Sequence, residues 1–488
     1  MSKKKKGATA PADMQKCEAF LHRILYRVKL PKKEMKALKE DFLRLFALYT
    51  EKGLSEAEIE ERVGADILGD FYRPASPYLW YPLDSAAKVY PLSMTHTKQT
   101  MFRVSAYMKE AVEPAILQVA LLSVLKRFPL FATTIKRGVF WHYFDAVRTR
   151  FSVQPEKNPP CSSIFLGGNR TPCFQVLYYK NRISLEIFHV LTDGTGAMTF
   201  LKSLVKEYLR LLGHNVAENL PSLSEPPHEE ETENAFLRAE KQKKGTGFLQ
   251  PMALQPGKGI KKRKEARILH YIMPTDKLIS AAKREDATVT TFLTSCIIKA
   301  VQDTAEMAGD KERISVQVPV NMRRFYPSQS LRNFSLYAVI STPYGMRDRA
   351  EILGETKKQL EEQTTPESLA RMMHSANQMA TSPLVKILPL GLKGYVLKKV
   401  YGVLGESTLS ATLSNLGNMT EDFGEHVRFF DFVLGRTSKQ NIKCTLVSYK
   451  ETAVLTVTDA LYESRFQESM AKSLSDAAVP FYIEGVAR

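Results

Sequence analysis

Apolar residues between positions 183 and 212 change from a strand-like to a helix-like spacing across one short polar turn. The run 183–190 is rich in β-branched residues and predicts a buried strand. The turn 192–196 contains Asp193 and two glycines, which favour a change of chain direction. Apolar residues then recur at helical spacing over 198–212, with Lys and Glu between them. We therefore expect a strand, a sharp turn and an amphipathic helix.

The same strand and helix spacings recur along the rest of the chain. Strands are predicted over 102–108, 131–144 (a pair turning at Arg137-Gly138), 174–179, 267–274, 314–320, 407–415, 427–434, 442–449 and 452–459. Helices are predicted over 111–128, 276–284, 289–307 and 464–478. We expect an α/β (α+β) fold of two halves, each with its own sheet.

The composition of the chain sets the predicted domain boundaries. Residues 1–13 form a basic, disordered head, and 14–83 form a helical region and linker, with Ser55 and Glu58 in a capping-box pattern. The first α/β half covers 84–219. A Pro-rich, then acidic, then basic connection covers 220–266, and the second half covers 267–488.

Charge and cysteine content limit the class of protein further. Lys and Arg total 69 against 52 Asp and Glu, so the net charge of +17 attracts anions such as phosphates. The five cysteines are scattered and form no C-x-x-C pair, which favours a reducing compartment. No apolar run is long enough for a transmembrane helix. The sequence therefore predicts a cytoplasmic protein.

Common enzyme motifs are absent from the sequence. There is no G-x-S-x-G nucleophile elbow, no phosphate-binding G-x-x-x-x-G-K-[ST] loop, no G-x-G-x-x-G and no zinc-type ligand spacing. This argues against hydrolases, nucleotide triphosphatases, dinucleotide enzymes and a metal site.

His189 is the histidine with a setting built to hold it, at the end of the predicted strand. An imidazole with an ordinary pKa of about 6.5 accepts a proton near neutral pH and suits a general base. Asp193 lies too close along the chain to stack under the ring, so we expect it to fix the turn or pair with a buried Arg. Gly194 is expected to permit the turn and leave room for substrate. The alternative for His189 is an ordinary core histidine.

Three segments in order then resemble one superfamily. HVLTDG (189–194) resembles the H-x-x-x-D-G core of the CoA-dependent acyltransferases, which include chloramphenicol acetyltransferase and the condensation domains of peptide synthetases. Many members carry H-H-x-x-x-D-G, and this chain has Phe188 at the first His position and His189 at the second. VPVNMRRFYPSQSLRNF (318–334) and SNLGN (414–418) resemble segments of bacterial alcohol acetyltransferase-type proteins.

The resemblance implies two chloramphenicol-acetyltransferase-like halves in a V, with a tunnel between them. His189 is then the general base that deprotonates an alcohol or amine for direct attack on a thioester. The thioester is acyl-CoA, as co-substrate, or an acyl carrier protein, and no bound cofactor is expected. Ser414, Asn415 or a backbone N–H near Gly194 is the expected oxyanion donor.

The arginines of the second segment have two expected roles. One of Arg323, Arg324 and Arg332 is expected to pair with Asp193 across the halves, as often in this superfamily. The others are expected to meet CoA phosphates or water.

Two other interpretations remain open. A catalytically inactive member of the same fold, acting as a binding or assembly platform, fits Phe188 and the additional N-terminal helices. A nucleic-acid-binding protein fits the net charge, but no nucleic-acid motif accompanies it, so no nucleic-acid partner is expected.

The segment 382–405 is apolar with interspersed lysines. It fits an ordinary surface helix packed on the core. It also fits a membrane-surface helix serving a lipophilic acceptor, with the protein peripheral at the inner membrane surface.

Overall fold

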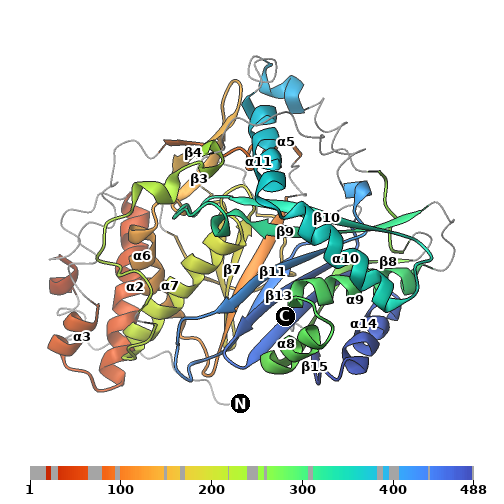
Figure 1. Cartoon of the computed structure of the whole chain (residues 1–488). Coiled ribbons are helices and arrows are strands. Elements are labelled where there is room, and N and C mark those ends of the chain that lie inside the picture. Colours follow the sequence, from red (N-terminus) through yellow and green to blue (C-terminus); the bar gives the residue numbers. More distant parts are fainter. Residues whose placement is uncertain are drawn as a thin grey trace.

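Figure 1 shows the computed structural model of the chain. The structure describes residues 18–22, 31–63, 80–93, 99–147, 151–164, 171–217, 219–238, 251–257, 261–305, 312–381, 388–394, 406–437 and 440–485. The predicted basic head 1–13 lies outside these residues, and so does most of 382–405.

Two large sheets form the body of the protein. The first has the strand order β12-β2-β7-β6-β5 and is antiparallel apart from the β5–β6 pair. Its strands are β2 (Met101–Met108), β5 (Gln154–Pro155), β6 (Phe174–Tyr179), β7 (Arg182–Phe188) and β12 (Val427–Leu434). The predicted strands 102–108, 174–179 and 427–434 are confirmed.

The second sheet has the order β10-β9-β11-β13-β14-β8-β15, in which β11 runs parallel to both of its neighbours. Its strands are β8 (Lys262–Pro274), β9 (Arg313–Asn321), β10 (Ser335–Pro343), β11 (Ala411–Met419), β13 (Ile442–Tyr449), β14 (Thr452–Leu461) and β15 (Tyr482–Gly485). Strand β11 begins later than the predicted 407–415, because the short helix η4 (Glu406–Thr408) precedes it.

Strand β12 corrects the prediction that each half has its own sheet. It follows β11 in sequence, yet it pairs antiparallel with β2 and forms the edge of the first sheet. Both of its faces are largely buried, since its neighbours in space come from both halves. The two halves are therefore interlocked by one exchanged strand.

Helices cover the outer faces of both sheets. The first sheet carries α6 (Pro114–Arg127) and α7 (Gly194–Leu212), and the second carries α8 (Thr275–Arg284), α9 (Val289–Thr304), α10 (Arg349–Gln363) and α14 (Arg465–Asp476). Four shorter or peripheral elements connect them: α5 (Tyr90–Ser93), η1 (Glu229–Thr232), η2 (Ala235–Arg238) and α11 (Pro366–Thr381). The apolar stripe of α7 is buried, as its spacing predicted.

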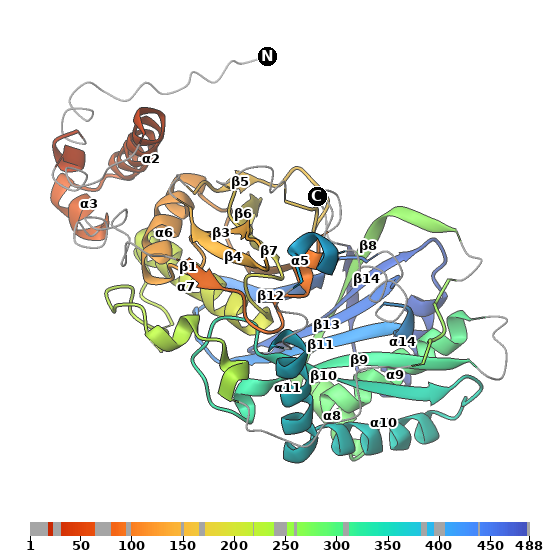
Figure 2. The ribbon, with the colours of Figure 1, turned by 90° about the horizontal axis from the view of Figure 1, so that it is seen from above.

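The N-terminal helices pack outside the first half. Helix α2 (Lys32–Glu51) contacts α6, and α3 (Glu56–Val63) contacts α7 (Figure 2). The hydroxyl of Tyr49 donates to the carbonyl oxygen of Leu211 at 2.6 Å. At the start of α3 the Ser55 amide donates to the Glu58 carboxylate at 2.7 Å, which confirms the capping box.

A small third sheet joins the predicted linker to the first half. Its strands are β1 (Trp80–Pro82), β3 (Thr133–Arg137) and β4 (His142–Ala146). The end of the segment predicted as a linker or docking segment is thus docked on the first half, because β1 pairs with β4. The hairpin of β3 and β4 was predicted correctly.

Two further properties follow from the described residues. None of their helices is both long and apolar enough to cross a bilayer. Their cysteines (Cys161, Cys173, Cys296 and Cys444) are free thiols.

Candidate active site

The junction between β7 and α7 carries the predicted site. All seven residues of β7 are buried, and the strand ends at Phe188. The His189 amide then donates to the carbonyl oxygen of Thr100 at 2.9 Å, which ties the start of the turn to the segment before β2. Helix α7 begins at Gly194, inside the predicted turn, because Asp193 serves as its N-cap.

The His189 side chain is partly buried and is in contact on several sides. Its ring stacks on the Tyr90 ring at a centroid distance of 4.8 Å and an angle of 20°. The Phe102 ring meets it edge-on at 4.9 Å. Its Nδ1 lies 3.0 Å from Oδ1 of Asn333, a residue of the second half. The imidazole therefore lies where segments of the two halves meet.

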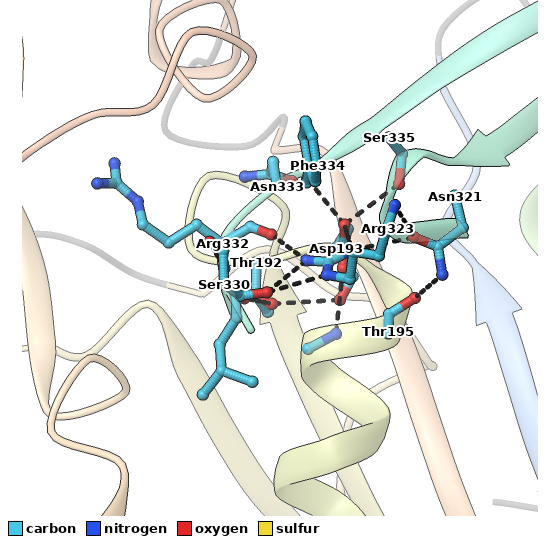
Figure 3. A network of polar contacts seen from close by, with 12 residues as sticks. Thr192, Asp193, Thr195, Asn321, Arg323, Ser330, Arg332, Asn333, Phe334 and Ser335 are labelled. Carbon is cyan, nitrogen blue, oxygen red and sulfur yellow. Dashed lines mark hydrogen bonds and ion pairs between the residues drawn. The ribbon is translucent and has the colours of Figure 1, made fainter. Parts of the chain in front are cut away.

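Asp193 joins the two halves through its carboxylate (Figure 3). Oδ1 accepts the amide of Gly196 at 3.1 Å, which caps α7. Oδ2 accepts Nη1 of Arg323 at 2.7 Å, the amide of Phe334 at 2.9 Å and the hydroxyl of Ser335 at 3.2 Å. Asp193 thus both fixes the turn and pairs with an arginine, as the sequence predicted, and Arg323 is that arginine.

The surroundings shift the pKa values of both groups downward. Burial lowers the pKa of His189, although a hydrogen bond with its own backbone, the Asp193 charge and the hydrogen bond with Asn333 oppose this effect. Burial alone favours the neutral form of Asp193. The Arg323 guanidinium and the backbone hydrogen bonds outweigh it, so the pKa of Asp193 lies below its usual range. His189 is therefore neutral and Asp193 ionised near pH 7.

A side chain at Gly194 would meet residues of the second half. It is the first residue of α7, and its φ is not positive. A Cβ there would lie 2.7 Å from Cδ2 of Leu416 in β11 and 3.6 Å from the Phe432 ring. The Cβ direction of Gly194 is thus occupied by side chains of the second half, and the room for substrate beside the imidazole stays a prediction.

Ser414 and Asn415 lie within β11, at the end of the predicted strand 407–415. A bulge follows, since the pairing with β13 is interrupted between Asn415 and Asn418. The Asn415 side chain is engaged locally: Nδ2 donates to the Thr290 hydroxyl at 3.1 Å, and Oδ1 accepts the Gly417 amide at 2.8 Å. Ser414 precedes Leu416 by two residues in this strand, and Leu416 is the residue that contacts Gly194.

The three arginines of the segment 318–334 have different environments. Arg323 donates to Asp193 and to the carbonyl oxygens of Ser330 and Arg332. Arg332 is 2% exposed; its guanidinium points away from Asp193 in Figure 3. It donates to the carbonyl oxygens of Thr232 and Pro82 and pairs with Asp84 at 3.5 Å.

Both of these guanidinium groups are held by internal acceptors, so their geometry speaks against a role in phosphate binding. Arg324 is exposed, at the end of η3 (Met322–Arg324), and its assignment to a CoA phosphate stays a prediction.

Sequence reasoning missed three residues around His189. Tyr90 and Phe102 hold its ring, and Asn333 meets its Nδ1. Asn333 lies within the segment 318–334 that resembles the acetyltransferases, next to Arg332. No local signal marks Tyr90 or Phe102, because only the folded chain brings them to the imidazole.

Metal ligation finds no support in this region. Within the parts of the chain that the structure describes, no group of three or more His, Cys, Asp or Glu residues is placed to hold a metal ion.

By sequence, neither a known family nor a curated protein matches this chain. The fold, however, is that of the two-lobed condensation domains and CoA-dependent acetyltransferases, as the resemblance implied. One similar structure is the first condensation domain of the calcium-dependent antibiotic synthetase, in complex with a substrate analogue. It has a TM-score of 0.57 and 13% identity, over 83% of this chain and 100% of that one.

Two fungal structures are similar as well. Fusarium sporotrichioides TRI101, complexed with coenzyme A and T-2, has a TM-score of 0.55 and 14% identity, over 84% of this chain and 100% of that one. The trichothecene 15-O-acetyltransferase TRI3 of the same organism has a TM-score of 0.50 and 13% identity, over 81% of this chain and 94% of that one. Because the sequence identities are so low, these similarities establish the fold alone.

Proposed function

We propose that the protein is an acyltransferase that moves an acyl group from a thioester, acyl-CoA or an acyl carrier protein, to an alcohol or amine. The observation that carries this proposal is the placement of His189. It is a neutral imidazole at the meeting of the two halves, in a fold that TRI101 and the condensation domains share. The resemblance to alcohol acetyltransferases makes an alcohol the first acceptor to test.

The proposed reaction needs one base and no acyl-enzyme. His189 takes the proton of the acceptor hydroxyl or amine as its O or N attacks the thioester carbon. The tetrahedral intermediate then collapses, the C–S bond breaks, and the imidazolium returns the proton to the departing thiolate. Removal of the acceptor proton in the transition state is worth about 10²–10⁴-fold in rate.

Ser414 is the better of the two side-chain candidates for the oxyanion donor. Asn415 uses its amide group on Thr290 and Gly417. Ser414 lies on the strand that reaches Gly194 through Leu416, close in sequence to the contact with the His189 turn. A backbone N–H near Gly194 remains the other candidate.

The experiment compares His189→Ala with the unchanged protein, using acetyl-CoA and a panel of primary alcohols and amines, and measures released thiol. We expect a loss of about 10²–10⁴-fold. His214→Ala is the matched control. It lies beyond the far end of α7, about 28 Å along a helix of this length, and is expected to keep full activity.

Full activity of His189→Ala would exclude the proposed base. The alternative of an inactive platform is tested in parallel. It predicts no thiol release from the unchanged protein and no thermal stabilisation by acetyl-CoA or CoA, whereas an acyltransferase binds both.

A lipophilic acceptor and a peripheral membrane position belong to the same proposal. The described part of 382–405 packs against the β3–β4 hairpin: the Leu390 amide donates to the Val139 carbonyl oxygen at 3.0 Å. Lys393 donates to the Phe140 carbonyl oxygen at 2.8 Å. Three apolar side chains are exposed here, Val139 by 73%, Phe140 by 46% and Leu392 by 50%, and they support a lipid-facing surface.

A further inference from the structure

One ring nitrogen of His189, Nδ1, meets a buried partner from the second half. Nδ1 lies 3.0 Å from Oδ1 of Asn333. In a neutral imidazole one nitrogen donates and the other accepts, so the Asn333 group that faces Nδ1 helps to set which nitrogen carries the proton, together with the hydrogen bond between the imidazole and its own backbone.

The orientation of the Asn333 amide is fixed by its other contacts. Nδ2 lies 3.4 Å from the carbonyl oxygen of Val190 and 3.4 Å from Oδ2 of Asp84. A carbonyl oxygen accepts hydrogen bonds and never donates them, so the NH₂ group must face Val190. The reversed amide would place oxygen against oxygen, and a side chain only 3% exposed has little access to water as a substitute partner. Oδ1 therefore faces His189.

The segment 84–90 holds this arrangement from one side. Asp84 is fully buried, accepts the Ala87 amide at 2.7 Å and pairs with Arg332 at 3.5 Å. Six residues later, Tyr90 stacks on the His189 ring. One short segment thus contacts both Asn333 and the imidazole, so that it restrains the ring plane and the amide together.

We propose that Asn333, held by Asp84, is a positioning residue that keeps His189 in the tautomer with the proton on Nδ1 and leaves the Nε2 lone pair for the acceptor. This inference rests on the proposed function for its catalytic meaning, but the tautomer itself is a property of the resting protein. Asn333 acts through His189.

The test reads the tautomer directly, by nitrogen-15 NMR of the protein labelled at histidine. The His189 signals are assigned by their loss in His189→Gln. At pH 7.5 we expect a protonated Nδ1 and an unprotonated Nε2 in the unchanged protein. Asn333→Leu removes the acceptor, and we expect the His189 signals to move toward the tautomer protonated at Nε2. Asn441→Leu is the matched control, since Asn441 is a buried amide that donates to the Pro256 carbonyl oxygen at 2.7 Å.

Kinetics supply the second readout. We expect Asn333→Leu to lower kcat by about tenfold or more with a smaller change in KM, because a wrong tautomer removes the base and leaves substrate binding in place.

The outcomes separate this inference from the proposed function. A protonated Nε2 in the unchanged protein overturns the inference, even if Asn333→Leu fails to fold. So does an Asn333→Leu protein that keeps both the Nδ1–H signal and the full rate. If the tautomer depends on Asn333 but no thioester is consumed by any variant, the positioning stands and the acyltransferase proposal fails.

Discussion

Asp193 shows at the scale of one residue how a carboxylate can serve two halves of a molecule. It caps α7 with one oxygen and with the other binds Arg323, which lies 130 residues further along the chain. Neither group is free to meet water, since the side chains of Asp193 and Arg323 are 4% and 12% exposed. Removing one partner of such a buried pair leaves an uncompensated charge, which is more costly than the pair is stabilising.

We therefore expect Asp193→Ala to lower the free energy of unfolding by about 3–5 kcal/mol. The effect should depend on pH in a defined direction. Because the folded pKa of Asp193 is lowered, its contribution is complete above the unfolded pKa of about 3.9 and is lost as the pH falls through the folded pKa.

Urea unfolding of both proteins between pH 7 and pH 3 measures this difference. It should be constant at the upper end and shrink at the lower end. Asp276→Ala is the control, because the Asp276 side chain is 71% exposed. An equal difference at pH 7 and pH 3 would contradict the assigned ion pair.

At the scale of secondary-structure elements, the site depends on the junction between β7 and α7. Its two glycines, Gly194 and Gly196, have different surroundings. A Cβ on Gly196 would collide with the Leu331 carbonyl oxygen and the Thr192 hydroxyl, both held by their own hydrogen bond. A Cβ on Gly194 would meet mainly the end of the Leu416 side chain, which can rotate away. The backbone contact makes Gly196 the less replaceable of the two.

We expect Gly196→Ala to destabilise the protein by about 1–3 kcal/mol or more, as overpacking does. Gly194→Ala should change stability by less than about 1 kcal/mol, because the helical preference of Ala offsets part of the contact. Gly354→Ala, within α10 and with no atom near its Cβ, is the control and should be neutral or stabilising. Thermal unfolding of the three variants tests this order, and a more severe loss for Gly194→Ala would reverse it.

At the scale of the whole molecule, polar groups are buried where the halves interlock. Oδ2 of Asp431 in β12 lies 3.1 Å from Nε2 of His270 in β8 and accepts the Tyr107 hydroxyl of β2 at 3.2 Å. Such contacts cross between the two sheets, so strand β12 is held from both sides. The tip of the β3–β4 hairpin projects at the top of Figure 1, away from this seam.

We expect this projecting tip of the β3–β4 hairpin to contact membranes. We expect the protein to float with vesicles that contain anionic lipid, and expect Phe140→Ser combined with Leu392→Ser to weaken this binding by about tenfold or more. Each apolar side chain transferred from water contributes about 1.5–3 kcal/mol when fully buried. Met252→Ser is the control, since Met252 is 72% exposed but lies in another segment. Absence of vesicle binding by the unchanged protein would remove the lipid-facing surface from the proposal.

The sequence by itself determined most of the secondary-structure elements and pointed to His189 as the candidate base. The spacing of apolar residues predicted β7, α7 and most other strands and helices, because periodicity is a local property of the chain. The strand, turn and helix around His189 likewise identified the candidate base, and the carboxylate of Asp193 was correctly assigned to structure.

Only the tertiary structure decided what surrounds these residues. Of the three arginines, Arg323 is the one that binds Asp193. Leu416 lies in the Cβ direction of Gly194, and β12 belongs to the first sheet. The tertiary structure also brought Asn333 and Tyr90 to the imidazole. These contacts join positions far apart in the sequence. Local spacing carries no information about them, because they arise when the two halves pack together.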